Sequence, residues 1–173
     1  MDGNNRYGNV AVFLHWIIAL FIIANVYIGL DFPHREPGGP FPPKPLLPLH
    51  ISLGLSVLVL SVVRLLWRLA HKPPPHPPTM KGWEIKLAGI AHVAFYFLIV
   101  AMPMSGWAIL SAHVNARWLS VFGIPVPPLP VGGGMSEAEV EVLHDQFVEV
   151  HEVLTLYVLI ALLVLHVGAV VKH

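Results

Sequence analysis

The sequence predicts an all-α integral membrane protein, a four-helix bundle formed by one domain that takes up residues 1–173. Composition is the first observation behind this prediction: 55% of the residues are hydrophobic, only 12% are charged, and the mean hydropathy is +0.69. Such values are typical of membrane proteins and not of soluble domains. The second observation is that four segments reach the length of about 20 apolar residues that a helix needs to cross a bilayer. The formal charge of zero gives no indication of a nucleic-acid or acidic partner.

The four predicted spans cover residues 10–30, 49–69, 85–110 and 147–171. Pro-rich segments separate the first three spans, and proline cannot continue a helix because it lacks a backbone donor and clashes with the preceding turn. Pro103 lies inside the third span and is expected to kink it, which neighbouring helices tolerate. Before the fourth span, Ser136 and Glu139 have the spacing of a capping box and predict a helix start there.

Lysines and arginines near the span ends predict the orientation, because cytoplasmic loops carry an excess of them. With both termini on one side, that side holds Arg6, Arg64, Arg68, Lys72, Lys81, Lys86 and Lys172. The opposite side holds Arg35, Lys44 and Arg117. We therefore expect both termini in the cytoplasm.

Four of the eleven histidines fall at two matching depths within the spans. His15 follows the start of the first span and His166 precedes the end of the fourth, so both lie roughly 8 Å inside the cytoplasmic edge at about 1.5 Å per residue. His50 and His151 lie at the outer level. Fifteen residues separate His151 from His166, about 22 Å along a helix and about 60° around it. A polar ring inside hydrocarbon indicates a functional site.

Two imidazoles at each level favour haem iron over an all-protein metal site. A structural zinc ion takes four ligands, whereas haem iron takes two because the porphyrin supplies the other four. Cysteine is absent, which excludes disulfides, iron–sulfur clusters and the C-x-x-C-H signature of covalent haem. We therefore expect two haem b groups held by the pairs His15–His166 and His50–His151. His144, one heptad before His151, is a rival for the outer position.

Two further residues of the cytoplasmic level are candidates for cofactor binding. Arg64 lies fourteen residues after His50, about 21 Å deeper and within about 40° of the same face. Its guanidinium can form charge-assisted bonds with haem propionates, or it can anchor the span as a snorkelling arginine. His92 lies early in the third span and is a candidate for contact with a propionate or a quinone, or for a packed core histidine. Small residues that would leave room for a flat macrocycle are Gly54, Ser56, Ala88, Gly89, Ala91, Gly106 and Ala161.

The pattern of these residues resembles the bacterial cytochrome b561 family, small four-span di-haem cytochromes of the inner membrane. Five segments carry the resemblance: LHW around His15, LHISLGLSVLVLSVVRLLWR, AHVAFYFLIVAMPMSGW, VHEVL at His151 and the final LHVGAVVKH. They occur in the order and spacing of the family over essentially the whole chain. Members usually continue beyond the position of His173 with a basic amphipathic tail.

The resemblance implies that His15 and His166 bind the inner haem and that His50 and His151, in preference to His144, bind the outer haem. It further implies electron transfer from a periplasmic one-electron donor to ubiquinone, which we expect near His92 and Arg64. One member looks like a superoxide oxidase, so superoxide is a candidate donor and the chain a candidate enzyme. Arg35, Lys44 and Arg117 are the candidates for steering this anion.

Three alternatives remain at this point. Related two-haem subunits relay electrons between a partner dehydrogenase or hydrogenase and the quinone pool. A divalent-metal transporter would use the histidines together with Glu149 and Glu152, although transport sites usually gather near the midplane. In a purely structural anchor the histidines would be buried groups hydrogen-bonded across helices.

Overall fold

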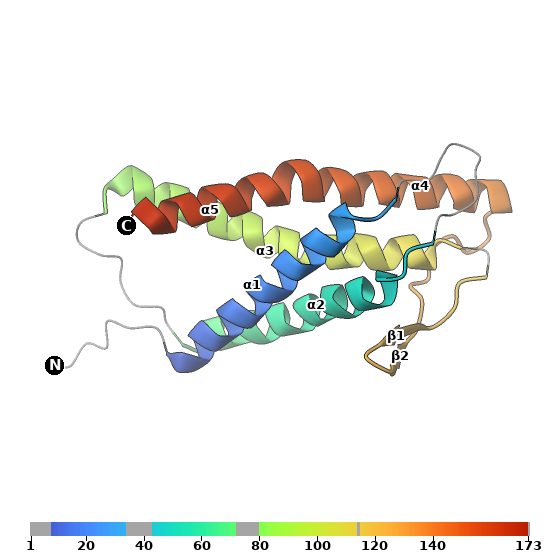
Figure 1. Cartoon of the computed structure of the whole chain (residues 1–173), viewed down its shortest axis with the longest axis horizontal. Coiled ribbons are helices and arrows are strands. Elements are labelled where there is room, and N and C mark those ends of the chain that lie inside the picture. The colour runs from blue at the N-terminus through green and yellow to red at the C-terminus, as the bar shows by residue number, and fades with distance from the viewer. Residues whose placement is uncertain (1–7, 34–42, 72–79, 114, 173) are drawn as a thin grey trace.

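Four long apolar helices run side by side along the molecule, as the sequence predicts (Figure 1). The computed structural model describes residues 8–33, 43–71, 80–113 and 115–172. Arg6, Arg35 and Lys72, which entered the predicted charge count, lie outside these ranges. The helices are α1 (Asn9–Leu30), α2 (Leu47–Ala70), α3 (Gly82–Ser111) and a last helix made of α4 (Glu137–Val153), the π-helical segment η1 (Leu154–Leu159) and α5 (Ile160–Lys172).

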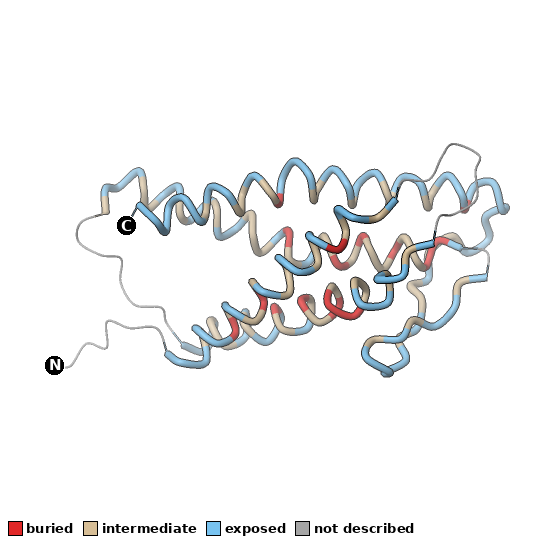
Figure 2. Tube along the Cα trace, viewed as in Figure 1, coloured by how far each residue is buried: buried red, intermediate tan, exposed pale blue. Residues whose placement is uncertain are grey.

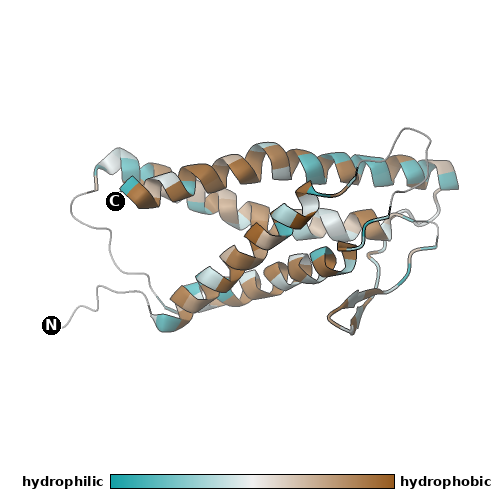
Figure 3. Cartoon of the chain, in the orientation of Figure 1, coloured by the Kyte–Doolittle hydropathy of each residue, from teal (hydrophilic) through white to brown (hydrophobic). Residues whose placement is uncertain are grey.

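All four helices are long and apolar enough to cross a membrane, and the predicted fold class is therefore confirmed. Many of their large apolar residues are exposed, whereas the first turns of α4 are largely hydrophilic (Figures 2 and 3). In water such apolar surfaces would be unfavourable, and in a bilayer they face lipid. That one domain makes up the whole chain stays a prediction.

The last helix begins ten residues before the predicted span start at residue 147. The predicted capping box forms at its first turn: the Ser136 backbone N–H donates to Glu139 Oε2 at 2.8 Å, and Glu139 N donates back to Ser136 Oγ at 3.4 Å. The helix is 36 residues long, about 54 Å at about 1.5 Å per residue, against a hydrocarbon thickness of about 30 Å. Because Glu137, Glu139, Glu141 and Asp145 lie in its first turns, we expect these turns to extend beyond the hydrocarbon.

The helices pack in the order of the chain. Helix α1 packs closely on α2, α2 packs on α3, and α3 packs on α4. Residues 9, 70, 82 and 172 mark the end of the bundle where the chain starts and stops, called here the termini end (Figure 1). The opposite end, called the hairpin end, carries a two-stranded antiparallel sheet of β1 (Leu119–Val121) and β2 (Ile124–Val126).

This β-hairpin is an element that the sequence does not predict. Its turn is fixed to α2, because the Phe122 backbone N–H donates to the hydroxyl of Ser52 at 3.2 Å. The loop that follows is fixed to α3: the Ser111 hydroxyl accepts from Leu129 N at 2.9 Å, and the Trp107 indole N–H donates to the carbonyl of Pro127 at 3.1 Å. These bonds satisfy polar groups that the loop would otherwise leave unpaired.

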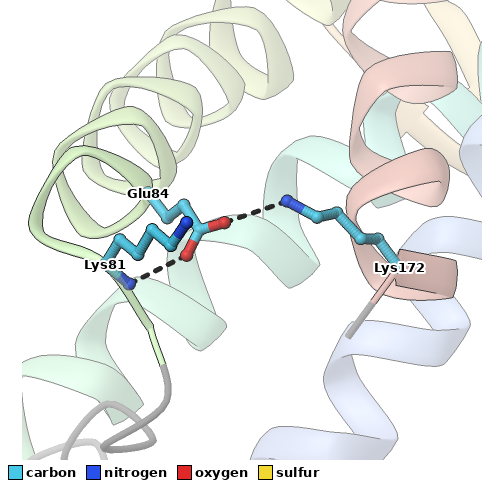
Figure 4. A network of polar contacts seen from close by, with 3 residues as sticks. All are labelled: Lys81, Glu84 and Lys172. Atoms are coloured by element: carbon cyan, nitrogen blue, oxygen red, sulfur yellow. Dashed lines mark hydrogen bonds and ion pairs between the residues drawn. The ribbon is translucent and has the colours of Figure 1, made fainter.

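At the termini end, an ion pair ties the last helix to α3 (Figure 4). The Glu84 carboxylate accepts from the Lys81 backbone N–H at 2.8 Å and from Lys172 Nζ at 2.9 Å. The Lys172 ammonium also lies 5.5 Å from the centre of the Trp83 ring. Because His166 lies between one and two turns before Lys172, this contact helps to fix the part of α5 that carries His166.

Candidate functional site

The structure brings the four predicted histidines together as two facing pairs. His15 of α1 and His166 of α5 have ring centres 6.2 Å apart, with planes inclined by 65°. His50 of α2 and His151 of α4 also have ring centres 6.2 Å apart, with planes inclined by 69°. The first pair lies toward the termini end and the second toward the hairpin end. The partners in each pair are those that depth along the helices predicts.

The separation of the rings fits one metal ion between them. A metal–imidazole bond is about 2 Å long and the ring centre lies about 1 Å beyond the bound nitrogen, so two imidazoles on opposite sides of one ion have centres about 6 Å apart. The helices that carry each pair, α1 with α5 and α2 with α4, are not among the closely packed pairs of helices in the described chain. Such an arrangement fits a flat macrocycle between the helices.

No group of three or more histidine, aspartate or glutamate side chains able to hold a metal ion occurs within the described ranges. A zinc ion held only by protein would need more ligands than either pair supplies. Two axial ligands suffice for haem iron, and the pairs therefore fit haem better than a bare ion.

Each histidine at the hairpin end makes a hydrogen bond that orients its ring. His50 Nδ1 lies 3.2 Å from the carbonyl oxygen of Asn25, which can only accept, so Nδ1 carries the proton. His151 Nδ1 lies 2.9 Å from the hydroxyl of Ser105, and this hydroxyl donates to the carbonyl of Met102 at 2.9 Å. Ser105 therefore accepts from Nδ1 of His151. In both rings Nε2 is left with a free lone pair, the form in which a histidine binds a metal.

Two glycines allow the helices to approach these rings. A Cβ atom on Gly29 of α1 would lie 3.2 Å from Cε1 of His50, and one on Gly106 of α3 would lie 3.2 Å from Cε1 of His151. These distances are tighter than ordinary van der Waals contact, so any larger residue would push the ring. Gly106 is among the small residues noted in the sequence, but nothing in the sequence pairs either glycine with a particular histidine.

A π-helical turn sets the register between the two histidines of the last helix. In η1 the Ile160 N–H bonds to the carbonyl of Thr155, an i→i+5 bond that takes in one residue more than an α-helical turn. One residue is about 100° of rotation, so the offset between His151 and His166 changes from about +60° to about −40°. Fourteen residues of α2 give His50 and Arg64 the same offset of about −40°. Between the outer and the inner level, the last helix and α2 therefore turn by the same angle.

At the termini end the pair lies among an aromatic ring and charged groups. The Phe95 ring meets His166 edge-on, with centres 5.3 Å apart. Arg64 and His92 both lie close enough to His15 for electrostatic interaction, so the structure gathers the predicted residues at this level. Within the described ranges no carboxylate forms an ion pair with Arg64. Its charge is therefore available for an anionic group. Neither His15 nor His166 makes a hydrogen bond to another residue that the structure describes, in contrast to the pair at the hairpin end.

Two observations favour His151 over His144 as the partner of His50. His144 Nδ1 lies 3.0 Å from a carboxylate oxygen of Asp145, and the ring that faces His50 is that of His151.

A cation, Lys44, lies close to the pair His50–His151. The Lys44 ammonium lies 5.3 Å from the centre of the Phe32 ring, and this ring meets His50 with centres 5.3 Å apart.

Two buried polar atoms that the sequence does not single out are Asn25 Oδ1 and Ser61 Oγ, neither of which has a hydrogen-bond partner. Ser61 is only 2% exposed and lies one turn before Arg64 on α2. A buried hydroxyl without a partner is costly.

Four membrane helices with two facing histidine pairs define a multi-pass protein of the class that holds haem between its helices. Comparison with protein families gives the same class: the family described as prokaryotic cytochrome b561 matches residues 6–173. The chain belongs to this family, which consists of bacterial membrane proteins that transfer electrons with b-type haem.

Three relatives show the range of the similarity. The chain is 27% identical to cytochrome b561 homolog 1 of Escherichia coli (strain K12) over 169 residues, which are 98% of this chain and 90% of the relative. It is 29% identical to the probable superoxide oxidase CybB of Yersinia pestis over 128 residues, 72% of this chain and 68% of the relative. It is 28% identical to cytochrome b561 homolog 2 of Escherichia coli (strain K12) over 127 residues, 68% of this chain and 61% of that relative.

The close contact of Gly106 with His151 gives a first prediction. Alanine normally stabilises a helix relative to glycine by about 1 kcal/mol, but Gly106→Ala should destabilise the protein by about 1–3 kcal/mol because the added methyl group overpacks the ring. Gly168→Ala is the matched control, since a Cβ there meets no atom within 4 Å. Thermal unfolding in detergent measures both. An equal or higher melting temperature for Gly106→Ala would contradict the packing described.

The hydroxyl of Ser105 gives a second prediction. If His151 binds haem iron, Ser105→Ala removes the hydroxyl that accepts from its Nδ1 and leaves the Met102 carbonyl as the remaining partner. This makes the imidazole less basic and disfavours the oxidised iron. The reduction potential of that haem should rise by roughly 30–60 mV, where about 59 mV corresponds to a tenfold change for one electron. Ser56→Ala is the control, because among the described residues the Ser56 hydroxyl bonds only to the Ser52 carbonyl. Redox titration that finds the same potentials in Ser105→Ala and the wild type would refute the role of Ser105.

Proposed function

We propose that the chain is a di-haem b-type cytochrome of the bacterial inner membrane that transfers electrons from superoxide, at the hairpin end, to ubiquinone, near the termini end. The observation that carries this proposal is the presence of two facing histidine pairs at opposite ends of one bundle. His15 and His166 would hold one haem and His50 and His151 the other. Haem iron, when bound, supplies one-electron redox chemistry.

The orientation in the membrane is part of the proposal. The termini end carries Arg64, Arg68, Lys81, Lys86 and Lys172 among the described residues. The positive-inside rule then assigns this end to the cytoplasm and the hairpin end to the periplasm. Superoxide would react at the periplasmic end, and ubiquinone would be reduced on the cytoplasmic side.

Lys44 supports an anionic donor. Of Lys44 and Arg117, the two expected cations that the structure describes, Lys44 lies next to the pair, through contact of its ammonium with Phe32 and of Phe32 with His50. A positive charge next to a site attracts an anion and raises its rate of encounter. Arg117 is exposed, and Arg35 lies outside the described residues.

Arg64 and His92 support a second polar site at the termini end. Both lie within electrostatic range of His15, and an arginine without a carboxylate partner suits a propionate or the carbonyl of a quinone.

The proposed reaction is balanced when two superoxide ions give two molecules of O₂ and two electrons, and one ubiquinone takes both electrons with two protons.

Haem content tests the site directly. The wild type should contain two haem b groups per chain, and both His50→Ala and His15→Ala should contain one, because each removes one axial ligand. His144→Ala is the control and should keep two. The pyridine haemochromogen assay on purified protein measures the ratio. Two haems in His50→Ala, or the loss of one in His144→Ala, would rule out the proposed ligands.

Activity tests the donor. Purified protein in liposomes that contain ubiquinone should form ubiquinol when superoxide is generated enzymatically outside. Lys44→Gln should lower kcat/KM for superoxide several-fold and weaken its dependence on salt, since steering by charge is screened. Arg117→Gln should change little.

Two haems without any superoxide-dependent ubiquinol would refute the proposed donor. Reduction that appears only when a periplasmic dehydrogenase or hydrogenase is added would favour the relay subunit instead.

A further inference from the structure

The β-hairpin carries an apolar tip that the proposed electron transfer does not use. The side chains of Trp118, Phe122 and Ile124 are 65%, 62% and 66% exposed. The segment from residue 118 to residue 126, WLSVFGIPV, contains no charged residue. Figure 3 shows the hairpin in the same hydrophobic colour as the helices. A tip of this composition is unfavourable in water.

The hairpin lies on the flank of the bundle, beside the first turns of α2, and does not cover the end of the bundle (Figure 1). Its turn is fixed to Ser52 by the 3.2 Å bond from Phe122 N. Ser52 lies five residues after Leu47, about 7.5 Å along α2, and the 24 residues of α2 span about 36 Å. If α2 is centred in about 30 Å of hydrocarbon, Ser52 lies about 4–5 Å inside it.

The turn itself is made by an unusual residue. Phe122 has a φ of 48° and Gly123 a φ of 87°, the backbone of a two-residue hairpin turn for which asparagine and glycine are preferred. A bulky aromatic residue in the left-handed region is strained. The geometry of the turn therefore does not explain why position 122 is phenylalanine. A need for an apolar side chain at the tip explains it.

Pro125 makes the outer edge of the hairpin suited to lipid. Ser120 and Pro125 are the second pair from the turn, a position where the two strands do not exchange hydrogen bonds and the N–H groups point away from the partner strand. Proline has no N–H, so β2 presents one unpaired donor fewer to its surroundings. In hydrocarbon an unpaired donor is costly, and at an edge proline also prevents the addition of a strand from another protein.

We propose that the hairpin tip inserts into the phospholipid leaflet at the hairpin end, with the Phe122 and Ile124 side chains among the acyl chains and Trp118 at the headgroup boundary. The occupant is lipid because the tip continues the lipid-facing flank of α2 at the same depth. Tryptophan is the residue that favours this boundary. The inserted hairpin, bonded to Ser52, fixes the depth of α2 two residues from His50.

The absence of cysteine allows a direct test. A spin label on Phe122→Cys in nanodiscs of uniform phosphatidylcholine is compared with labels on Val59→Cys and Val142→Cys. Val59 lies mid-way along α2 and is 62% exposed, and Val142 lies on the projecting turns of α4 and is 59% exposed. Collision with oxygen, which concentrates in lipid, and with a water-soluble nickel chelate is measured by power saturation.

The expected result is that the label at position 122 has the high oxygen-to-nickel ratio of position 59, several-fold above that of position 142. A ratio like that of position 142 places the tip in water and overturns the proposal. Low collision with both reagents means that protein covers the tip, which also overturns it.

A measurement on the native residues guards against a label that disturbs the turn. Brominated lipids should quench part of the tryptophan fluorescence of the wild type. In Trp118→Phe this quenchable part should be smaller, because Trp118 no longer contributes to it. An unchanged quenchable share in Trp118→Phe contradicts the insertion.

Discussion

The structure depends on the meeting of imidazole rings from helices whose backbones do not pack closely. A polar ring in hydrocarbon is unfavourable unless a partner binds it. His15 meets His166 and His50 meets His151, so each pair connects two helices that do not otherwise pack closely, α1 with α5 and α2 with α4. Whatever binds both rings of a pair therefore also ties these helices together, and cofactor binding and bundle stability become parts of one equilibrium.

Depth is the property of this fold that the sequence predicts well, because a helix across a bilayer converts residue number into distance along the membrane normal. The apolar spans and the pairing of the four histidines follow from this conversion, and the capping box at Ser136 follows from local sequence. His144 and His151 could not be separated by periodicity, since seven residues return to the same face. They differ by about 10 Å in depth, and the length of the last helix puts His144 on its projecting turns.

The features that the sequence did not predict are those that depend on backbone register or on contacts between helices. The π-helical turn of η1 has no signature in composition, yet it changes the direction of His166 by the equivalent of one residue. The hairpin has strands of three residues and a Phe-Gly turn in place of Asn-Gly. The roles of Gly29 and Gly106 appear only when a neighbouring helix brings a histidine ring against them. The binding of iron by these histidines stays a prediction, supported by the spacing of the rings.

The two ends of the bundle differ in a way that bears on the direction of electron transfer. At the hairpin end both Nδ1 atoms donate to protein oxygens, which makes the imidazoles more basic and favours oxidised iron. At the termini end there is no such bond to His15 or His166 within the described chain. Lys44 acts in the opposite sense at the hairpin end, but it lies in the segment that leads into α2, where water and salt screen it. If one haem lies at each pair, as proposed, the hydrogen bonds of His50 and His151 favour a lower reduction potential at the hairpin end, which agrees with the direction of electron transfer that the proposal requires.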